Sequence, residues 1–375
     1  MKRILTYVVL AAVLLLSDGL LFIANWADAA GNDRISFTSN RAGNFDIYVM
    51  DVNGERLRNV TNHPTDEFGP WVPAPLPVHT WSPDGRFLAY VSGRDGSFKV
   101  YVMDTRTQKH RRLTHHHESE WSPAWSPDGK WIAFVSRDPK EVRQGKTTDH
   151  IYKTDINGAD VIQLTPPGSG HGHPAWSSDS KQIAFFSHKR HRQQGLHIMN
   201  ADGEKLRRVP DGNIQAMKGI FGNQCAWSPD GKQIAFSLYM PQAQREHLCV
   251  IDVDGENFRQ LTRGGPIEGE RMLEKREPVE APAVPLPLTD WLPWISSPAW
   301  SPDGKWIAYV YSDRVLWQTA DIYIIDAEGN GPGKPLVEGV GQDLSPAWVP
   351  EGFLSVSPGA EKQTTLWGRL KQIDK

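Results

Sequence analysis

Short apolar runs recur along the chain, and a polar turn follows each of them. Runs such as 132–135 (I-A-F-V) and 183–186 (I-A-F-F) hold β-branched and aromatic residues and are bounded by Gly, Asp and Pro. This length and composition are typical of β-strands. Beyond the first 30 residues we find no convincing period of an amphipathic helix, so the pattern predicts an all-β fold.

The apolar runs belong to a repeated unit that begins with tryptophan. W-S-P-D-G starts at four of these residues and drifts to W-S-S-D-S and W-V-P-E-G at two more: Trp81, Trp125, Trp227 and Trp300, then Trp176 and Trp348. Each copy continues through I-A-F, a segment like I-Y-V-M-D, an Asp-x-Asp-Gly turn and, in several copies, a last strand ending in Leu-Thr. Pro presets φ and Gly supplies positive φ, so both turns close hairpins. Each copy of the repeat is therefore predicted to form four antiparallel strands.

A four-stranded unit of this kind cannot bury both of its faces alone, whereas a radial arrangement lets each unit cover its neighbour. The sequence therefore predicts one β-propeller domain over residues 31–375. Six tryptophan strands favour six blades, with the segment 34–61 and the segment 347–370 joined in one closing blade. The alternative is seven blades, in which each terminal blade stays incomplete.

The repeat also resembles that of the TolB-type propellers, over about residues 34–370. The resemblance implies a propeller fold and leaves open a docking role like that of TolB in the Tol–Pal envelope system. TolB carries an α/β domain before its propeller. Here the repeats begin soon after residue 30, so we expect the propeller alone.

The strand order predicts two different faces. In an up-and-down blade, the turns between strands one and two and between strands three and four lie on one face, and here they are uniformly short. The other connections hold the length variation: 62–80, 136–149, 187–195, 210–224, 237–246, 263–297 and 311–320. Binding residues concentrate on variable loops that a rigid scaffold holds, so we expect function on this second face.

Histidine, arginine and tryptophan side chains on these loops are the candidate binding residues: His79, His116, His171, His173, His188, Arg190, Arg192, Trp291 and Trp294. The two tryptophans belong to a long Pro-rich insertion at 263–297 that suits a protein or carbohydrate partner. His79, His171 and His173 are also candidate ligands of a divalent transition metal, because imidazoles from different blades could converge. The oligogalacturonate lyases, related propellers with a His-bound metal, lend this hypothesis support. The alternative is a set of solvated loop histidines.

The N-terminus has the order of a secretory signal. Lys2 and Arg3 precede an apolar run (4–16), and Ala27-Asp28-Ala29 offers small residues before a cleavage site. We predict a signal peptide at 1–30 and an exported protein, periplasmic or extracellular. The alternative is an uncleaved anchor over 4–23, which Asp18 disfavours because a charge near the bilayer centre is costly.

Charge and cysteine content narrow the function classes. The net charge of −3 and the pI of about 6.5 give no basic excess for nucleic acid. Cys225 and Cys249 fall on the first and third strands of one blade, too far apart for a disulfide, so we predict two free thiols. We also expect a monomer without a membrane span after signal cleavage.

No sequence motif identifies an enzyme. The chain contains no G-x-S-x-G, H-E-x-x-H, P-loop or dinucleotide fingerprint. The prediction is therefore a non-catalytic binding or scaffold propeller of the cell envelope or periplasm. It would recognise a protein or glycan through the long-loop face and need no cofactor. The alternative is a metal-assisted, carbohydrate-active enzyme, similar to the oligogalacturonate lyases, that acts on an acidic glycan.

Overall fold

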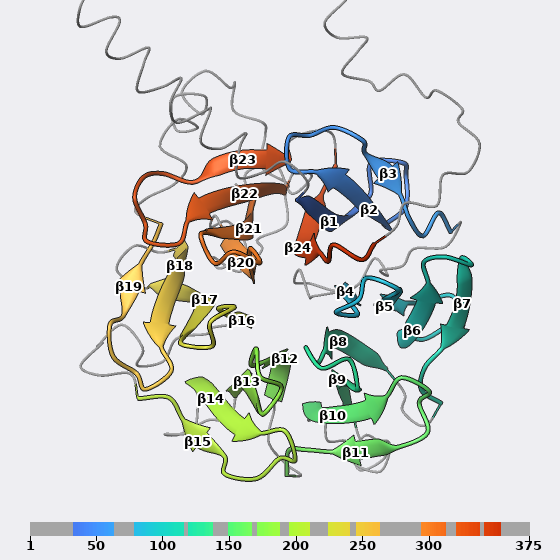
Figure 1. The fold of residues 1–375 in the computed structure, drawn as a ribbon, viewed down its shortest axis with the longest axis horizontal. Helices are drawn as coiled ribbons and strands as arrows, with labels where there is room; N and C mark the ends of the chain where they lie inside the picture. Colours follow the sequence, from blue (N-terminus) through green and yellow to red (C-terminus); the bar gives the residue numbers. More distant parts are fainter. Residues whose placement is uncertain are drawn as a thin grey trace, which may run out of the picture.

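The protein is a ring of six radial blades (Figure 1). The computed structural model describes residues 33–63, 79–115, 119–137, 149–166, 171–187, 195–210, 224–240, 245–262, 294–312, 320–337 and 341–353. Within these ranges the strands form six four-stranded antiparallel sheets. This confirms the predicted all-β, six-bladed propeller, and the seven-bladed alternative is not adopted. The predicted signal peptide (1–30) and residues 263–293 of the insertion lie outside the described residues.

Each blade contributes one strand to each of four concentric positions. The innermost strands, around the axis in Figure 1, are β24 (Asp343–Val349), β4 (His79–Trp81), β8 (Glu120–Trp125), β12 (His171–Trp176), β16 (Cys225–Trp227) and β20 (Trp294–Trp300). The second strands carry the I-A-F runs and are β1 (Arg34–Ser39), β5 (Phe87–Ser92), β9 (Trp131–Arg137), β13 (Gln182–Ser187), β17 (Gln233–Met240) and β21 (Trp306–Ser312).

The third strands are about as long as the second strands and mostly buried, whereas the outermost strands have only two to four residues and are more exposed. The third strands are β2 (Asp46–Asp51), β6 (Lys99–Asp104), β10 (Asp149–Asp155), β14 (Gly195–Asn200), β18 (Arg245–Asp252) and β22 (Asp321–Asp326). The outermost are β3 (Arg58–Asn59), β7 (Lys109–Arg112), β11 (Val161–Gln163), β15 (Arg207–Arg208), β19 (Arg259–Gln260) and β23 (Lys334–Val337). We number the blades I to VI from the one that contains β1, so blade II is β4–β7 and blade VI is β20–β23.

Blade I closes the ring by combining both ends of the described chain. Its innermost strand β24 pairs with β1 in antiparallel register, from Arg34 opposite Val349 to Ser39 opposite Asp343. The chain then reaches blade II, where the Phe353 ring packs edge-on against Trp81 at 4.9 Å between centroids. Arg34 donates a hydrogen bond to the Phe353 carbonyl at 3.2 Å. The predicted joining of the two ends is therefore confirmed, with one C-terminal strand in place.

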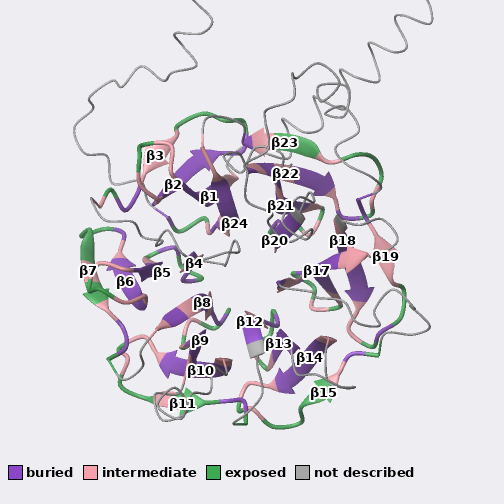
Figure 2. Ribbon diagram, turned by 180° about the vertical axis from the view of Figure 1, so that it is seen from behind, coloured by how far each residue is buried: buried purple, intermediate pink, exposed green. Residues whose placement is uncertain are grey.

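The hydrophobic core lies between the blades. Figure 2 shows most of the inner strands in purple, the colour of buried residues. Six clusters of buried residues each draw on two neighbouring blades, for example Phe186 of blade IV and Phe236 of blade V, whose rings are 5.9 Å apart. This arrangement buries both faces of every sheet, which a single blade cannot do.

The repeat tryptophans also join neighbouring blades by hydrogen bonds. In four blades the indole N–H donates to the carbonyl of the alanine that precedes the tryptophan of the previous blade, at 3.0–3.2 Å: Trp176 to Ala124, Trp227 to Ala175, Trp300 to Ala226 and Trp348 to Ala299. Trp125 differs. Blade II has Thr80 in place of that alanine, and in the part of the chain that the structure describes the Trp125 indole N–H has no partner.

Replacing Trp227 by phenylalanine should therefore destabilise the protein by about 1 kcal/mol more than replacing Trp125. Both side chains are buried to the same degree, so the loss of ring volume is matched and the difference reports the hydrogen bond. Urea unfolding of W227F and W125F measures it. Equal losses in the two variants would contradict an energetic role for the indole bond.

The two cysteines lie in blade V as predicted. Cys225 and Cys249 are opposite the same residue, Phe236, on the two sides of β17, and both are free thiols. Burial raises the pKa of the Cys225 thiol to about 12, so this group stays protonated and unreactive at neutral pH.

Candidate functional site

The antiparallel strand order separates two faces of the ring. The turns between strands one and two and between strands three and four form the turn face, and the remaining connections form the loop face. The structure describes every turn of the turn face. The internal segments outside the described ranges all fall in loop-face connections.

The turn face is built from one repeated hydrogen-bonding pattern. In blade V, the Ser228 hydroxyl donates to Asp230 Oδ1 at 2.6 Å and accepts the Gln233 N–H at 2.9 Å. Asp230 also accepts the Lys232 N–H at 3.1 Å, and the Ser228 hydroxyl is the main cause of a lowered pKa for the Asp230 carboxyl. Four other blades repeat this pattern, around Asp84, Asp128, Asp179 and Asp303. These turns are scaffold.

The innermost strands carry a bulge at the ring axis in four blades. The residue three positions before the tryptophan, followed by proline in each case, has a positive φ of 51–59°: Ser122, His173, Ser297 and Ser345. The ladder shifts register at or close to this residue in the same four blades, and all four residues are buried. Non-glycine residues rarely hold this conformation, and bulges re-aim side chains.

His79 is one of the predicted site residues, and it lies in the interface between blades I and II. Its Nε2 is 2.8 Å from Ser36 Oγ, which also accepts the Trp81 indole N–H at 2.8 Å. The single Ser36 hydroxyl proton goes to the Ala347 carbonyl at 3.1 Å, so His79 Nε2 donates to Ser36 Oγ. Burial lowers the pKa of His79 to about 3. This histidine therefore serves as a neutral link between two blades.

His173 has a related place between blades III and IV. Its Nδ1 is 2.9 Å from Ser122 Oγ, and both residues belong to the bulged inner strands. His79 and His173 thus each bond to a serine of the preceding blade, and no contact between them brings them into one site. Within the described ranges, no group of three His, Cys, Asp or Glu side chains could hold a metal ion.

The other predicted site residues are not tested by the structure. His171 begins β12 and Trp294 begins β20, but their side chains are outside what is described. His116, His188, Arg190, Arg192 and Trp291 lie outside the described residues altogether. The binding and metal assignments of these residues remain predictions.

Two buried carboxylates at the loop-face ends of inner strands were missed at the level of sequence. Glu120 accepts hydrogen bonds from the Val100 N–H, at 3.0 Å, and from the Thr114 hydroxyl. Asp343 accepts a hydrogen bond from Arg41 Nη2 at 2.8 Å. Burial raises the pKa of both carboxyls. Each stands five residues before its repeat tryptophan, and this shared spacing could have revealed them.

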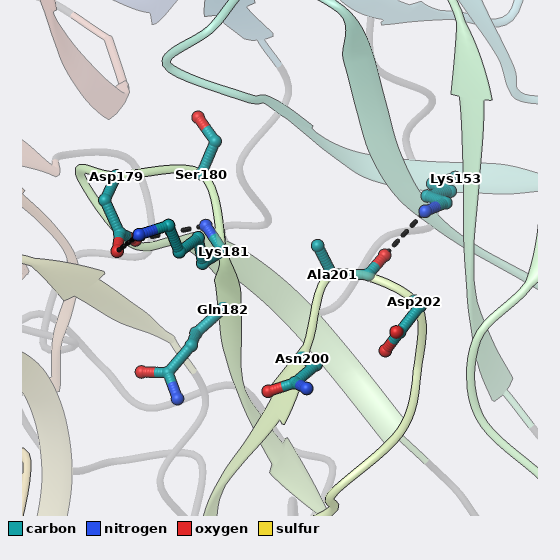
Figure 3. A pocket seen from close by; sticks show the side chains of 8 residues that line it. All are labelled: Lys153, Asp179, Ser180, Lys181, Gln182, Asn200, Ala201 and Asp202. Carbon is teal, nitrogen blue, oxygen red and sulfur yellow. Dashed lines mark hydrogen bonds and ion pairs between the residues drawn. The ribbon is translucent and has the colours of Figure 1, made fainter.

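A pocket on the turn face lies between blades III and IV (Figure 3). Its volume is about 590 Å³, and all of its lining residues except Ala201 have polar side chains: Lys153, Asp179, Ser180, Lys181, Gln182, Asn200, Ala201 and Asp202. The sequence predicts function on the loop face and a uniform turn face. The drifted W-S-S-D-S copy at Trp176 is the sequence feature that marks this departure, since it supplies the turn beside the pocket.

The blades, the interblade tryptophans and the closing strand define a six-bladed β-propeller. The profile of the TolB beta propeller domain matches residues 74–220. The crystal structure of TolB from Acinetobacter baumannii superposes with a TM-score of 0.61 at 20% identity, over 88% of this chain and 70% of that one. The described part of the chain is therefore a TolB-type propeller.

Sequence relatives extend this similarity. The Tol-Pal system protein TolB of Francisella tularensis is 22% identical over 313 residues, which cover 82% of this chain and 60% of that protein. Dipeptidyl-peptidase 5 of Porphyromonas gingivalis is 30% identical over 242 residues, covering 56% of this chain and 33% of that protein. The chain spans between 24% and 66% of the length of the first curated relatives that it matches. In the described ranges, no helix has the length and apolar character needed to cross a membrane.

Proposed function

We propose that this protein is a binding or scaffold propeller of the cell envelope that recognises a protein or glycan through its loop face. One observation carries the proposal: the ring and its turn face are built from one repeated pattern, while the length variation lies in the connections of the opposite face. Variable connections on a rigid scaffold are where propellers place their specificity.

The relatives favour a protein partner over a glycan. The Francisella relative is named as a protein of the Tol-Pal system, and its similarity covers 82% of this chain and 60% of that protein. The signal-like N-terminus (1–30) supports export to the periplasm or beyond. The metal-assisted lyase remains a hypothesis from sequence alone, since His79 and His173 each serve a blade interface.

The test compares two variants of the exported chain. In the first, a short Gly-Ser linker replaces residues 263–293, the longest loop-face connection. In the second, two exposed turn-face lysines are removed (Lys130→Ala and Lys305→Ala). Each protein is immobilised and incubated with solubilised envelope extract, and the captured proteins are quantified by mass spectrometry. From a parallel extract treated with protease, the captured carbohydrate is quantified by sugar analysis, which shows whether the ligand is a glycan.

We expect a small set of proteins to be enriched at least tenfold by the native chain and by the turn-face variant, and lost with the loop replacement. If both variants capture the same proteins as the native chain, the loop face is not the binding surface and the proposal is overturned. Capture that survives protease treatment would identify a glycan in place of a protein.

A further inference from the structure

The pocket between blades III and IV gathers residues that break the internal repeat. Equivalent positions of the six blades can be compared. Where five blades carry one residue type and the sixth differs, the difference indicates an additional role for that position. Three departures from the repeat, Lys153, Ser180 and Asn200, meet at this one pocket, on the face opposite to the proposed partner surface.

Lys153 is the first departure. Its position in the third strand is aliphatic in the other five blades: Val49, Val102, Ile198, Val250 and Ile324. Those side chains are at most 4% exposed, and Lys153 is itself only 8% exposed. Burying an ammonium where an aliphatic side chain would pack is unfavourable for stability, so its presence in one blade indicates a function of its own.

The ammonium of Lys153 is held at the pocket wall. Its Nζ donates to the Ala201 carbonyl at 2.6 Å and lies 4.6 Å from the centroid of the Trp131 ring (Figure 3 shows the hydrogen bond). Burial lowers the pKa of Lys153, and the Asp202 carboxylate opposes this shift. Ala201 is the one hydrogen-bond acceptor of Lys153 among the described residues, so two N–H donors remain for a ligand.

The other departures lie across the pocket in blade IV. Ser180 replaces the glycine of the other W-S-P-D-G turns and keeps a φ of +60°, a strained conformation for serine. Asn200 stands where the other blades have Asp51, Asp104, Asp155, Asp252 and Asp326, which removes one negative charge. Ala201 is not itself a departure, because blade VI has Ala327 at this position. It is smaller than the valine, threonine or isoleucine of the other four blades and leaves space beside Lys153.

The lining holds two lysines and two aspartates, so its formal charges sum to zero. Lys181 lies 3.7 Å from Asp179 on the exposed side. Lys153 and Asp202 attract each other, but no ion pair within 4 Å joins them among the described residues. Two separated charges of opposite sign suit a ligand that itself carries one ammonium and one carboxylate, because such a ligand satisfies both without adding net charge.

We propose that this pocket binds a small zwitterion of the amino-acid or dipeptide class. Lys153 would bind the carboxylate, Asp202 would bind the ammonium, and the side-chain amides of Asn200 and Gln182 would bind the polar groups between them. A volume of about 590 Å³ lies in the range of small-ligand pockets and accommodates a dipeptide. This site is independent of the loop-face function proposed above.

Binding is measured by NMR titration of the exported chain with L-alanine and with L-alanyl-L-alanine. The comparison of the two affinities distinguishes a free amino acid from a dipeptide as the ligand. N-acetyl-alanyl-alanine lacks the ammonium and alanyl-alanine amide lacks the carboxylate. The key variant is Lys153→Val, which restores the residue type of the repeat and should fold at least as stably as the native chain. Lys232→Ala is the matched control, because Lys232 occupies the turn position of Lys181 in blade V.

We expect K153V to weaken binding of the zwitterion at least tenfold while its Tm stays equal or rises, and K232A to bind like the native chain. Both blocked dipeptides should bind at least tenfold more weakly. No binding of either probe at 10 mM (about the weak limit of small-ligand sites) would overturn the proposal. Equal binding by K153V, or by the blocked dipeptides, would do so too. None of these outcomes changes the capture of envelope partners, so the two proposals fail separately.

Discussion

Replacing Gly158 by alanine should destabilise the protein by about 4 kcal/mol, whereas the same change at Gly54 should cost about 1 kcal/mol. The two glycines end the same type of turn, Asp-x-Asn-Gly, at the same place in blades III and I. Both have positive φ, +76° and +83°, which an alanine adopts only with strain.

The difference arises from the neighbouring blade. A Cβ atom on Gly54 would meet nothing within 4 Å. A Cβ on Gly158 would overlap the Leu113 carbonyl oxygen of blade II and stand 2.9 Å from its carbonyl carbon. Because the obstacle is the backbone of the buried residue that follows β7, relief requires the interface between blades II and III to open.

Urea unfolding of G158A and G54A, with the slope m compared between them, measures the two losses. An equal effect at both positions would show that the local turn conformation alone sets the energy. A glycine-to-alanine change at a third turn, Gly43, provides a further control, since its φ is +105° and a Cβ there also meets nothing within 4 Å.

Lowering the pH from 7.5 to 5 should destabilise the protein by about 2 kcal/mol through His79 alone. The pKa of this group is about 3 in the folded protein, against an ordinary value near 6.5. Between these two values the unfolded chain binds a proton that the folded chain does not. Stability therefore falls as the pH falls below 6.5, by about 1.4 kcal/mol per pH unit, and the effect is absent above pH 7.5.

Other ionisable groups of the protein also titrate between pH 7.5 and 5, so the measurement is the difference between the native chain and His79→Gln. Glutamine has no proton to gain, and its amide N–H can still donate to Ser36 Oγ. We expect the unfolding free energy of the native chain to fall by about 2 kcal/mol more than that of H79Q between pH 7.5 and 5. Parallel pH profiles would contradict a buried, neutral His79.

The local chemistry of the repeat was sufficient to predict most of the scaffold. Trp81 and its five counterparts identified the innermost strands, and the S-P-D-G and D-x-D-G turns identified the hairpins, because turn type depends on two or three adjacent residues. The same periodicity predicted the separation of Cys225 from Cys249 by a full strand. Counting tryptophans also gave the correct number of blades.

The candidate site could be predicted much less well. His79 was chosen for its place before an inner strand, but its ring is directed into a blade interface, where Ser36 from 43 residues earlier holds it. Lys153 was not chosen, although it differs from five aliphatic counterparts in the repeat. Its role depends on the Ala201 carbonyl, 48 residues along the chain, which no local pattern identifies.

The sequence by itself determined the strands, the turns and the division into two faces, since each follows from residues close together in the chain. It favoured six blades over seven, and the structure decided between them. Only the tertiary structure decided which side chains meet between blades. It placed Gly158 against a carbonyl and left Gly54 open, although the two turns share one motif. It also closed the ring through β24 and brought the repeat-breaking residues to one pocket. The physical reason is that contacts between blades join residues about one repeat apart, and their pairing is set by how neighbouring sheets pack.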